Sequence, residues 1–168
     1  LKWQATIGAP VRSSPALGPD GTVYVGVMDG SVRAFDSANG APRGMAWTSY
    51  QLYSSPAVAA DRTVFIGSLD GGIYAFTSTL QPKGFPWPYY TSDLVQSSPT
   101  IGSDGTVYVG NEAGRVYAIR GAGGLASSPW PMFRRTVRHT AYDWHPVGGG
   151  VEPGQAIFSM AVGASGTL

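Results

Sequence analysis

The chain has 168 residues, of which 24 are glycine and 13 are proline. Together these two residue types make up about 22 % of the chain, where average usage gives about 12 %. Only 12 % of the residues are charged and the net charge is +1, whereas 43 % are hydrophobic. This composition excludes a chain disordered by charge and predicts a folded, turn-rich protein.

Three absences narrow the class of protein further. The chain has no cysteine, which excludes a disulfide scaffold, cysteine-ligated zinc and thiol catalysis. No apolar run reaches the roughly 18 residues of a membrane-spanning helix. The chain begins with Leu1 and Lys2, without an initiator Met or a secretory leader, so we expect a mature or excised segment.

One cluster of basic residues stands out near the C-terminal end, where Arg134, Arg135 and Arg138 lie beside His139. Nucleic-acid binding needs a concentrated basic surface, and the rest of the sequence is balanced in charge. We therefore expect a solvated or locally paired cluster and no nucleic-acid partner.

A repeat dominates the first three quarters of the chain. Its copies begin near residues 13, 54 and 97, at spacings of 41 and 43 residues. Each copy starts with Ser-Ser-Pro and a short apolar stretch, continues with a Thr-Val-aromatic segment that ends in glycine, and closes with an aromatic or aliphatic run. So many positions held in register indicate a repeated structural unit.

Each copy contains two tight turns flanked by short apolar runs. Asp-Gly is a strong hairpin signal because glycine accepts positive φ and aspartate bonds its own backbone. The pair occurs at Asp20-Gly21, Asp29-Gly30, Asp70-Gly71 and Asp104-Gly105, with weaker equivalents at Asp61-Arg62 and Ala113-Gly114. The runs between the turns have the length and the composition of strands.

Two further features complete the predicted unit. Successive residues are apolar at 23–25 and 64–66, so we expect strands covered on both faces. A tryptophan precedes each Ser-Ser-Pro, at Trp3, Trp47 and Trp87, and we assign these stretches to the remaining strand of the unit. Four short antiparallel strands in about 42 residues are typical of a β-propeller blade.

The repeat resembles the pyrroloquinoline-quinone-like β-propeller repeat, which is shared by quinoprotein dehydrogenases and by non-catalytic propellers similar to the outer-membrane assembly lipoprotein BamB. The resemblance covers residues 1 to about 126. It implies an all-β protein, a partial β-propeller of about three four-stranded antiparallel blades, with an irregular C-terminal tail. It also implies an extracytoplasmic location, in the periplasm, the outer envelope or the cell surface.

Three blades with one leading strand are fewer than the roughly four to eight that close a propeller. We therefore expect a fragment of a longer propeller, or a ring completed by association. Residues 1–126 are predicted to form the blades. Residues 127–146 resemble the Trp-Pro-Met-Phe-Arg segment that flanks propellers of this family, 147–150 read as a linker, and 151–168 resemble the start of an immunoglobulin-like module.

The favoured function is a non-catalytic scaffold that binds a protein or a surface polymer through its blade loops. The alternative is a fragment of a quinone-dependent alcohol or sugar dehydrogenase, which would need the quinone, Ca²⁺ and a carboxylate base. The family's structural signature is matched only at Ala34, Asp36 and Gly40. The first copy departs from the signature at Asn39, which replaces Thr, and at Trp47, which lies too far along the chain; the other copies have Thr77 and Arg120 in place of Asp. The adjacent cysteine pair that is common in those enzymes is impossible in a chain without cysteine. We assign no catalytic, cofactor-binding or metal-binding residue and expect no cofactor.

Two sets of residues could bind a metal ion. The repeated aspartates are candidate Ca²⁺ ligands, but each stands alone in a two-residue turn, which favours a turn-forming role; they are Asp20, Asp29, Asp61, Asp70 and Asp104. The spacing of His139, Asp143 and His145 could hold a divalent metal, although structural or surface histidines are favoured. The serines that recur at 13, 54 and 97 are predicted scaffold positions because no base accompanies them.

Aromatic residues are the remaining candidates for a binding surface. They could line a carbohydrate or peptide site, but we favour packing of a loop against the neighbouring blade. The residues concerned are Trp47, Trp87, Trp130, Tyr89 and Tyr90.

Overall fold

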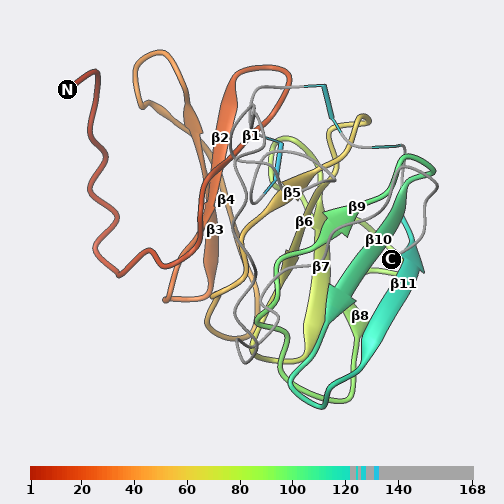
Figure 1. Cartoon of the computed structure of the whole chain (residues 1–168). Helices are drawn as coiled ribbons and strands as arrows, with labels where there is room; N and C mark the ends of the chain where they lie inside the picture. Colours follow the sequence, from red (N-terminus) through yellow and green to blue (C-terminus); the bar gives the residue numbers. More distant parts are fainter. Residues whose placement is uncertain (122–123, 125, 128–130, 133–168) are drawn as a thin grey trace, which may run out of the picture.

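The structure, a computed structural model, describes residues 1–121, 124, 126–127 and 131–132. Within this range the regular structure is entirely β, and three antiparallel sheets follow one another along the chain (Figure 1). No apolar helix of membrane-spanning length occurs in this part of the chain.

Each sheet is an up-and-down meander built from one copy of the repeat. Blade 1 contains β1 (Ala16–Leu17), β2 (Thr22–Gly26), β3 (Ser31–Asp36) and β4 (Pro42–Trp47). Blade 2 contains β5 (Ala57–Val58), β6 (Val64–Gly67), β7 (Gly72–Phe76) and β8 (Tyr89–Tyr90). Blade 3 contains β9 (Thr100–Ile101), β10 (Thr106–Gly110) and β11 (Val116–Arg120), three strands among the residues described.

The hairpin turns form as the Asp-Gly pairs predict. Glycine adopts positive φ in each of them, for example 91° at Gly30 and 83° at Gly105, and Arg62 takes the glycine's place at 67°. In all five aspartate turns Oδ1 accepts the N–H two residues later. The distances are 3.1 Å at Asp20, 2.8 Å at Asp29, 3.0 Å at Asp61, 2.7 Å at Asp70 and 2.9 Å at Asp104. These aspartates are turn formers.

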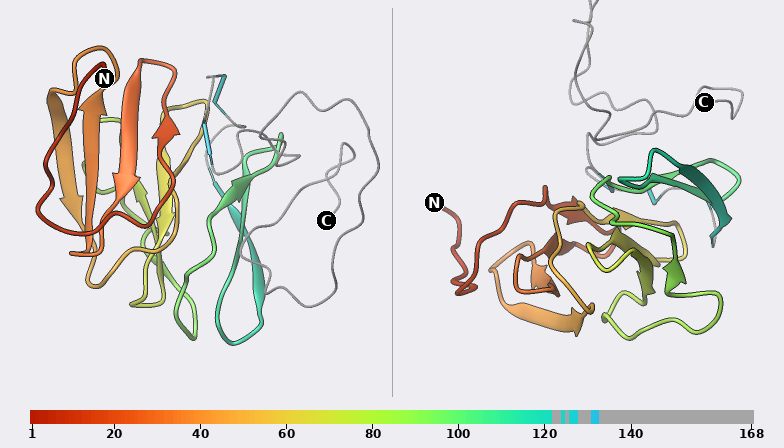
Figure 2. Two further views of the ribbon diagram at one scale, coloured as in Figure 1. Left: turned by 60° about the vertical axis from the view of Figure 1, so that its left-hand side comes forward. Right: turned by 90° about the horizontal axis from the view of Figure 1, so that it is seen from below.

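The three sheets lie side by side as successive propeller blades (Figure 2). We call the face of a blade that points toward the preceding repeat its leading face, and the opposite one its trailing face. The leading face of blade 2 packs on the trailing face of blade 1 through Val58, Val64, Ile66 and Phe76 against Tyr24, Val32 and Ala34. The trailing face of blade 2 packs on the leading face of blade 3 through Ala57, Phe65, Ile73 and Ala75 against Ile101, Val107, Val109 and Ile119. The prediction of an all-β partial propeller is confirmed.

Burial differs between the inner and the outer blades. Residues Val64, Phe65 and Ile66 are all fully buried, as expected for a strand covered on both faces. In β2 Thr22 and Tyr24, which point to the trailing face, are buried, while Val23 and Val25 on the leading face are half-buried. Blade 1 is therefore covered on its trailing face and only partly on its leading face.

The tryptophan-bearing stretches differ from the expectation. Trp47 ends β4, and β8 begins two residues after Trp87, but residues 1–15 contain no strand. The prediction of a leading strand around Trp3 is wrong. A strand needs a hydrogen-bonding neighbour, whereas here Pro10 lacks an N–H and Gly8 has a φ of 84°. Instead Trp3 lies against Phe35 on the leading face of blade 1, with ring centroids 6.4 Å apart.

The predicted segments after the blades lie almost entirely outside the described residues. Only Ser127, Pro131 and Met132 of the 127–146 segment are described. The flanking segment, the linker at 147–150 and the immunoglobulin-like module at 151–168 stay predictions.

The paired serines connect the strands and the blades. The first serine of each pair accepts the N–H of the glycine that ends the second strand, over 2.8 Å at Ser13, 3.0 Å at Ser54 and 2.8 Å at Ser97. The second serine links neighbouring blades, because Ser14 N–H donates to Ser55 Oγ and Ser55 N–H donates to Ser98 Oγ, both over 2.9 Å. These contacts give the serine pairs a structural role.

The strand-end glycines allow a direct test of how closely the blades pack. A Cβ at Gly67 would clash with the Val95 side chain and lie 3.1 Å from the Val95 carbonyl oxygen, whereas a Cβ at Gly110 would meet nothing closer than 3.7 Å. We expect Gly67→Ala to lower the free energy of unfolding by about 1–3 kcal/mol through overpacking, and the matched control Gly110→Ala to change it by less than about 0.5 kcal/mol. Urea denaturation measures both. Equal effects of the two variants would contradict the blade packing described.

Candidate interaction site

Asp36, one of the three residues that match the quinoprotein signature, closes the turn between β3 and β4. Its Oδ1 accepts the Ala38 N–H over 2.7 Å, and its Oδ2 accepts the Arg43 guanidinium over 2.6 Å. These two hydrogen bonds lower the pKa of Asp36. Of the other matched residues, Ala34 is buried between blades 1 and 2, and Gly40 lies under the Trp3 ring with a φ of 75°. All three matched residues thus have turn or packing roles.

Three of the turn-forming aspartates, Asp29, Asp61 and Asp104, have a lowered pKa. Burial tends to raise the pKa of Asp29 and Asp61, but hydrogen bonds from Ser31 and Thr63 and the nearby cations outweigh it, so both values are lowered. Asp104 has a lowered pKa because the Thr106 N–H and hydroxyl donate to it. Among the residues described, no three His, Cys, Asp or Glu side chains gather closely enough to hold a metal ion.

Several candidates fall outside the described residues. They are the basic cluster with Arg134, Arg135, Arg138 and His139, the possible metal ligands His139, Asp143 and His145, and the aromatic Trp130.

A polar cluster at the junction of blades 1 and 2, which we call the rim cluster, comprises Ser49, Asp70, Tyr74 and Tyr90. Asp70 Oδ2 accepts the Tyr74 hydroxyl over 2.6 Å and the Ser49 N–H over 3.0 Å. The Tyr74 and Tyr90 hydroxyls lie 3.4 Å apart. Burial and the hydrogen bond to Asp70 raise the pKa of Tyr74 well above its ordinary value of 10. Tyr74 therefore stays a hydroxyl donor, while the Tyr90 side chain is exposed to solvent.

The remaining aromatic candidates divide into two groups. Trp87 packs edge-on against Phe65 at 5.0 Å, and Tyr89 contacts Tyr117 of blade 3 at 6.1 Å. These two pack between blades as expected. Trp47 stays exposed, with the Arg33 guanidinium 6.0 Å from its ring centroid, and Tyr90 is exposed in the rim cluster.

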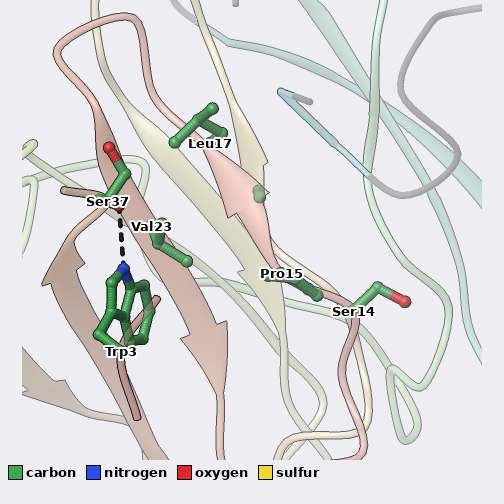
Figure 3. Close-up of a pocket in the computed structure, with 7 residues that line it drawn as sticks. Trp3, Ser14, Pro15, Leu17, Val23 and Ser37 are labelled. Atoms are coloured by element: carbon green, nitrogen blue, oxygen red, sulfur yellow. Dashed lines mark hydrogen bonds between the residues drawn. The ribbon is translucent and has the colours of Figure 1, made fainter. Parts of the chain in front are cut away.

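A pocket of about 490 Å³ opens on the leading face of blade 1 (Figure 3). Its lining is almost entirely apolar and consists of Trp3, Ser14, Pro15, Ala16, Leu17, Val23 and Ser37. The indole N–H of Trp3 donates to the Ser37 carbonyl over 2.9 Å at one side of it. Neither this pocket nor the rim cluster is predicted from the sequence. The one available signal was Tyr74, which takes the repeat position of Arg33.

The three blades and their connections define the chain as part of an all-β propeller. No protein-family profile matches the chain, and a search of curated proteins finds no match. Among solved structures the chain is similar to BamB from Moraxella catarrhalis, at 19 % sequence identity and a TM-score of 0.62. The match covers 76 % of this chain and 38 % of that one. The chain thus spans well under half the length of BamB, and the likeness shows a shared propeller fold.

The lowered aspartate pKa values predict how stability depends on pH. A carboxylate whose pKa is lower in the folded than in the unfolded state stabilises the fold above its unfolded value, here 3.8, and this contribution is lost as the pH falls. We expect the melting temperature to fall between about pH 5 and pH 2. In a variant with Asp29, Asp61 and Asp104 replaced by Asn, which keeps the turn acceptors, the decrease should be smaller. Identical pH profiles in calorimetry would contradict this account.

Proposed function

We propose that the chain is part of a non-catalytic β-propeller that serves as an interaction scaffold for a protein or a surface polymer, within a larger extracytoplasmic protein. The observation that carries the proposal is that the carboxylates are engaged in hydrogen bonds within turns. The five repeated aspartates close hairpin turns, and Asp36 closes a further turn with an ion pair to Arg43.

The competing hypothesis, a quinone-dependent dehydrogenase, requires a different arrangement of the same residue type. Hydride abstraction from an alcohol needs a free carboxylate base beside a Ca²⁺ that several clustered oxygen atoms hold. The turn aspartates lie in separate hairpins, and the Oδ1 atom of each accepts a hydrogen bond from a backbone N–H. This geometry favours the scaffold hypothesis.

The rim cluster is the best-formed candidate for partner binding on the blade loops. It combines the exposed ring of Tyr90 with hydroxyl and carboxylate groups fixed by hydrogen bonds. Tyrosine and tryptophan are enriched among the residues that dominate protein interfaces, and loops on a rigid scaffold commonly carry recognition.

The extracytoplasmic location rests on the resemblance of the repeat and on the fold shared with BamB. BamB has more than twice the length that the match covers, which supports a role for these blades as part of a larger ring.

A spectroscopic titration with pyrroloquinoline quinone and Ca²⁺ tests the proposal. We expect no saturable change in quinone absorbance, because the carboxylates are engaged in turns. A quinoprotein dehydrogenase stripped of its cofactor serves as the positive control under the same conditions. Saturable one-to-one binding, weakened in Asp36→Asn, would overturn the scaffold proposal in favour of the dehydrogenase hypothesis.

A further inference from the structure

The outer edge of blade 1 is a strand with one unpaired side. The first strands of the three blades, β1, β5 and β9, contact one another in turn and therefore lie innermost. At the opposite side of its sheet, β4 is the last strand and lies on the outside of blade 1 (Figure 2). This edge points away from the inner strands, and the neighbouring blades pack on the faces of the sheet.

The register between β3 and β4 shows which backbone groups of β4 point outward. Thr48 N–H donates to the Gly30 carbonyl over 2.9 Å. Hydrogen-bonded pairs alternate along an antiparallel ladder, so the backbone groups of Ala46 point to β3 and those of Met45 and Trp47 point outward. Among the residues that the structure describes, no group bonds to these outward N–H and C=O groups.

Blade 2 shows that this edge stays open when both neighbouring blades are present. By strand register, Met45 corresponds to Pro88 and Trp47 corresponds to Tyr90. Blades 1 and 3 cover the two faces of blade 2, yet Pro88 is exposed and Tyr90 is 57 % exposed, against 56 % for Trp47. A blade packed before blade 1 would therefore leave the β4 edge accessible.

The two outer edges differ in their ability to pair with a further strand. In blade 2 the outward position carries Pro88, which has no N–H, and β8 contains only two residues. Prolines and short edge strands are devices that prevent strand addition. In contrast, β4 has six residues, and its only proline, Pro42, is the first of them. Blade 1 thus lacks the protection that blade 2 has.

The backbone groups at this edge fit an extended polypeptide. Met45 and Trp47 together offer two donors and two acceptors at the two-residue period of a strand. An edge about 20 Å long and about 5 Å wide covers roughly 100 Å² on each face of the sheet, far below the roughly 1,200 Å² of specific interfaces between folded proteins. Two rigid copies paired along this edge would bury too little area, whereas a flexible segment gains main-chain hydrogen bonds directly.

Exposed apolar side chains lie along the same edge. Trp47 has the Arg33 guanidinium 6.0 Å from its ring centroid, and Asp29 holds that guanidinium over 3.1 Å. Met45 is 46 % exposed and, two residues from Trp47, lies on the same face of the sheet. An added strand would place alternate side chains beside Met45 and Trp47. Apolar residues at alternate positions of the added strand are therefore favoured.

We propose that β4 is a strand-addition site, at which an extended segment of a partner protein, with apolar residues at alternate positions, pairs with Met45 and Trp47 as a fifth strand of blade 1. This inference rests on the proposed scaffold function and names the kind of partner that the scaffold binds. The two proposals fail separately. Quinone binding would overturn the scaffold function whatever pairs with β4, and an edge that binds no peptide would leave the quinone result unchanged.

An NMR titration of the full, isotope-labelled chain tests the proposal. The probe is an acetylated and amidated peptide of about six alternating threonine and valine residues, with a glutamate at each end for solubility. With the peptide in excess, we expect the Met45 and Trp47 amides to shift and to gain roughly tenfold protection from hydrogen exchange. The Ala46 amide, already bonded to β3, should keep its protection.

Two variants at one position separate backbone pairing from side-chain contact. Met45→Pro removes the outward N–H, and Pro88 shows that a blade accepts proline at the equivalent position. We expect this variant to weaken peptide binding roughly tenfold or more. The matched control Met45→Leu keeps the N–H and an apolar side chain of similar volume, so its affinity should stay within about twofold. Circular dichroism checks that both variants are folded.

A modified probe gives the same comparison without changing the chain. The peptide with every amide N-methylated cannot donate to β4, and we expect it to bind at least roughly tenfold more weakly. The proposal would be overturned if the Met45 and Trp47 amides gain no protection, or if neither Met45→Pro nor N-methylation weakens binding. Protection of both amides that rises with the concentration of the chain alone would show that a second copy occupies the edge, and would also overturn it.

Discussion

The hydrogen bonds of the Ser-Ser-Pro pairs set the geometry on which the three blades depend. The first serine fixes the end of the second strand through a glycine amide, and the second serine joins neighbouring blades through a backbone N–H. Ser54 and Ser55 are buried, so losing either hydroxyl would leave an amide without a partner in a water-poor environment. The proline that follows leads into the short first strand of each blade. Apolar packing between sheets is thereby held in one register from blade to blade.

The turns could be predicted from sequence because their determinants are local. Asp29 and Gly30 contain the acceptor and the conformational freedom that the hairpin needs within four residues, and the structure places them as expected. The location of Trp3 could not be predicted in this way. Its position depends on the Ser37 carbonyl and the Phe35 ring, which the chain brings close only after blade 1 has formed.

The candidate sites show the same limit. Asp70 was predicted as a turn former and is one, but its second oxygen also accepts Tyr74 and Ser49 from different strands and loops. The change from Arg33 in blade 1 to Tyr74 in blade 2 marks the position as variable, but it does not reveal that Asp70 and Ser49 are its partners. The fold is compatible with catalysis or with binding alone. The hydrogen-bond partners of individual carboxylates, and not the repeat, therefore distinguish the two functions.

Blade 2 is covered on both faces, and blades 1 and 3 are each covered fully on one. In a stack where each unit contacts only its neighbours, stability is a sum of unit and interface contributions, and it is highest where a unit has two interfaces. The amides of β6 and β7 should therefore open to solvent only with the whole array, while those at either end open in smaller, cheaper fluctuations. The buried run Val64–Phe65–Ile66 therefore lies in the most stable part of the described structure. Blades 1 and 3, with one fully covered face each, are less stable against local opening.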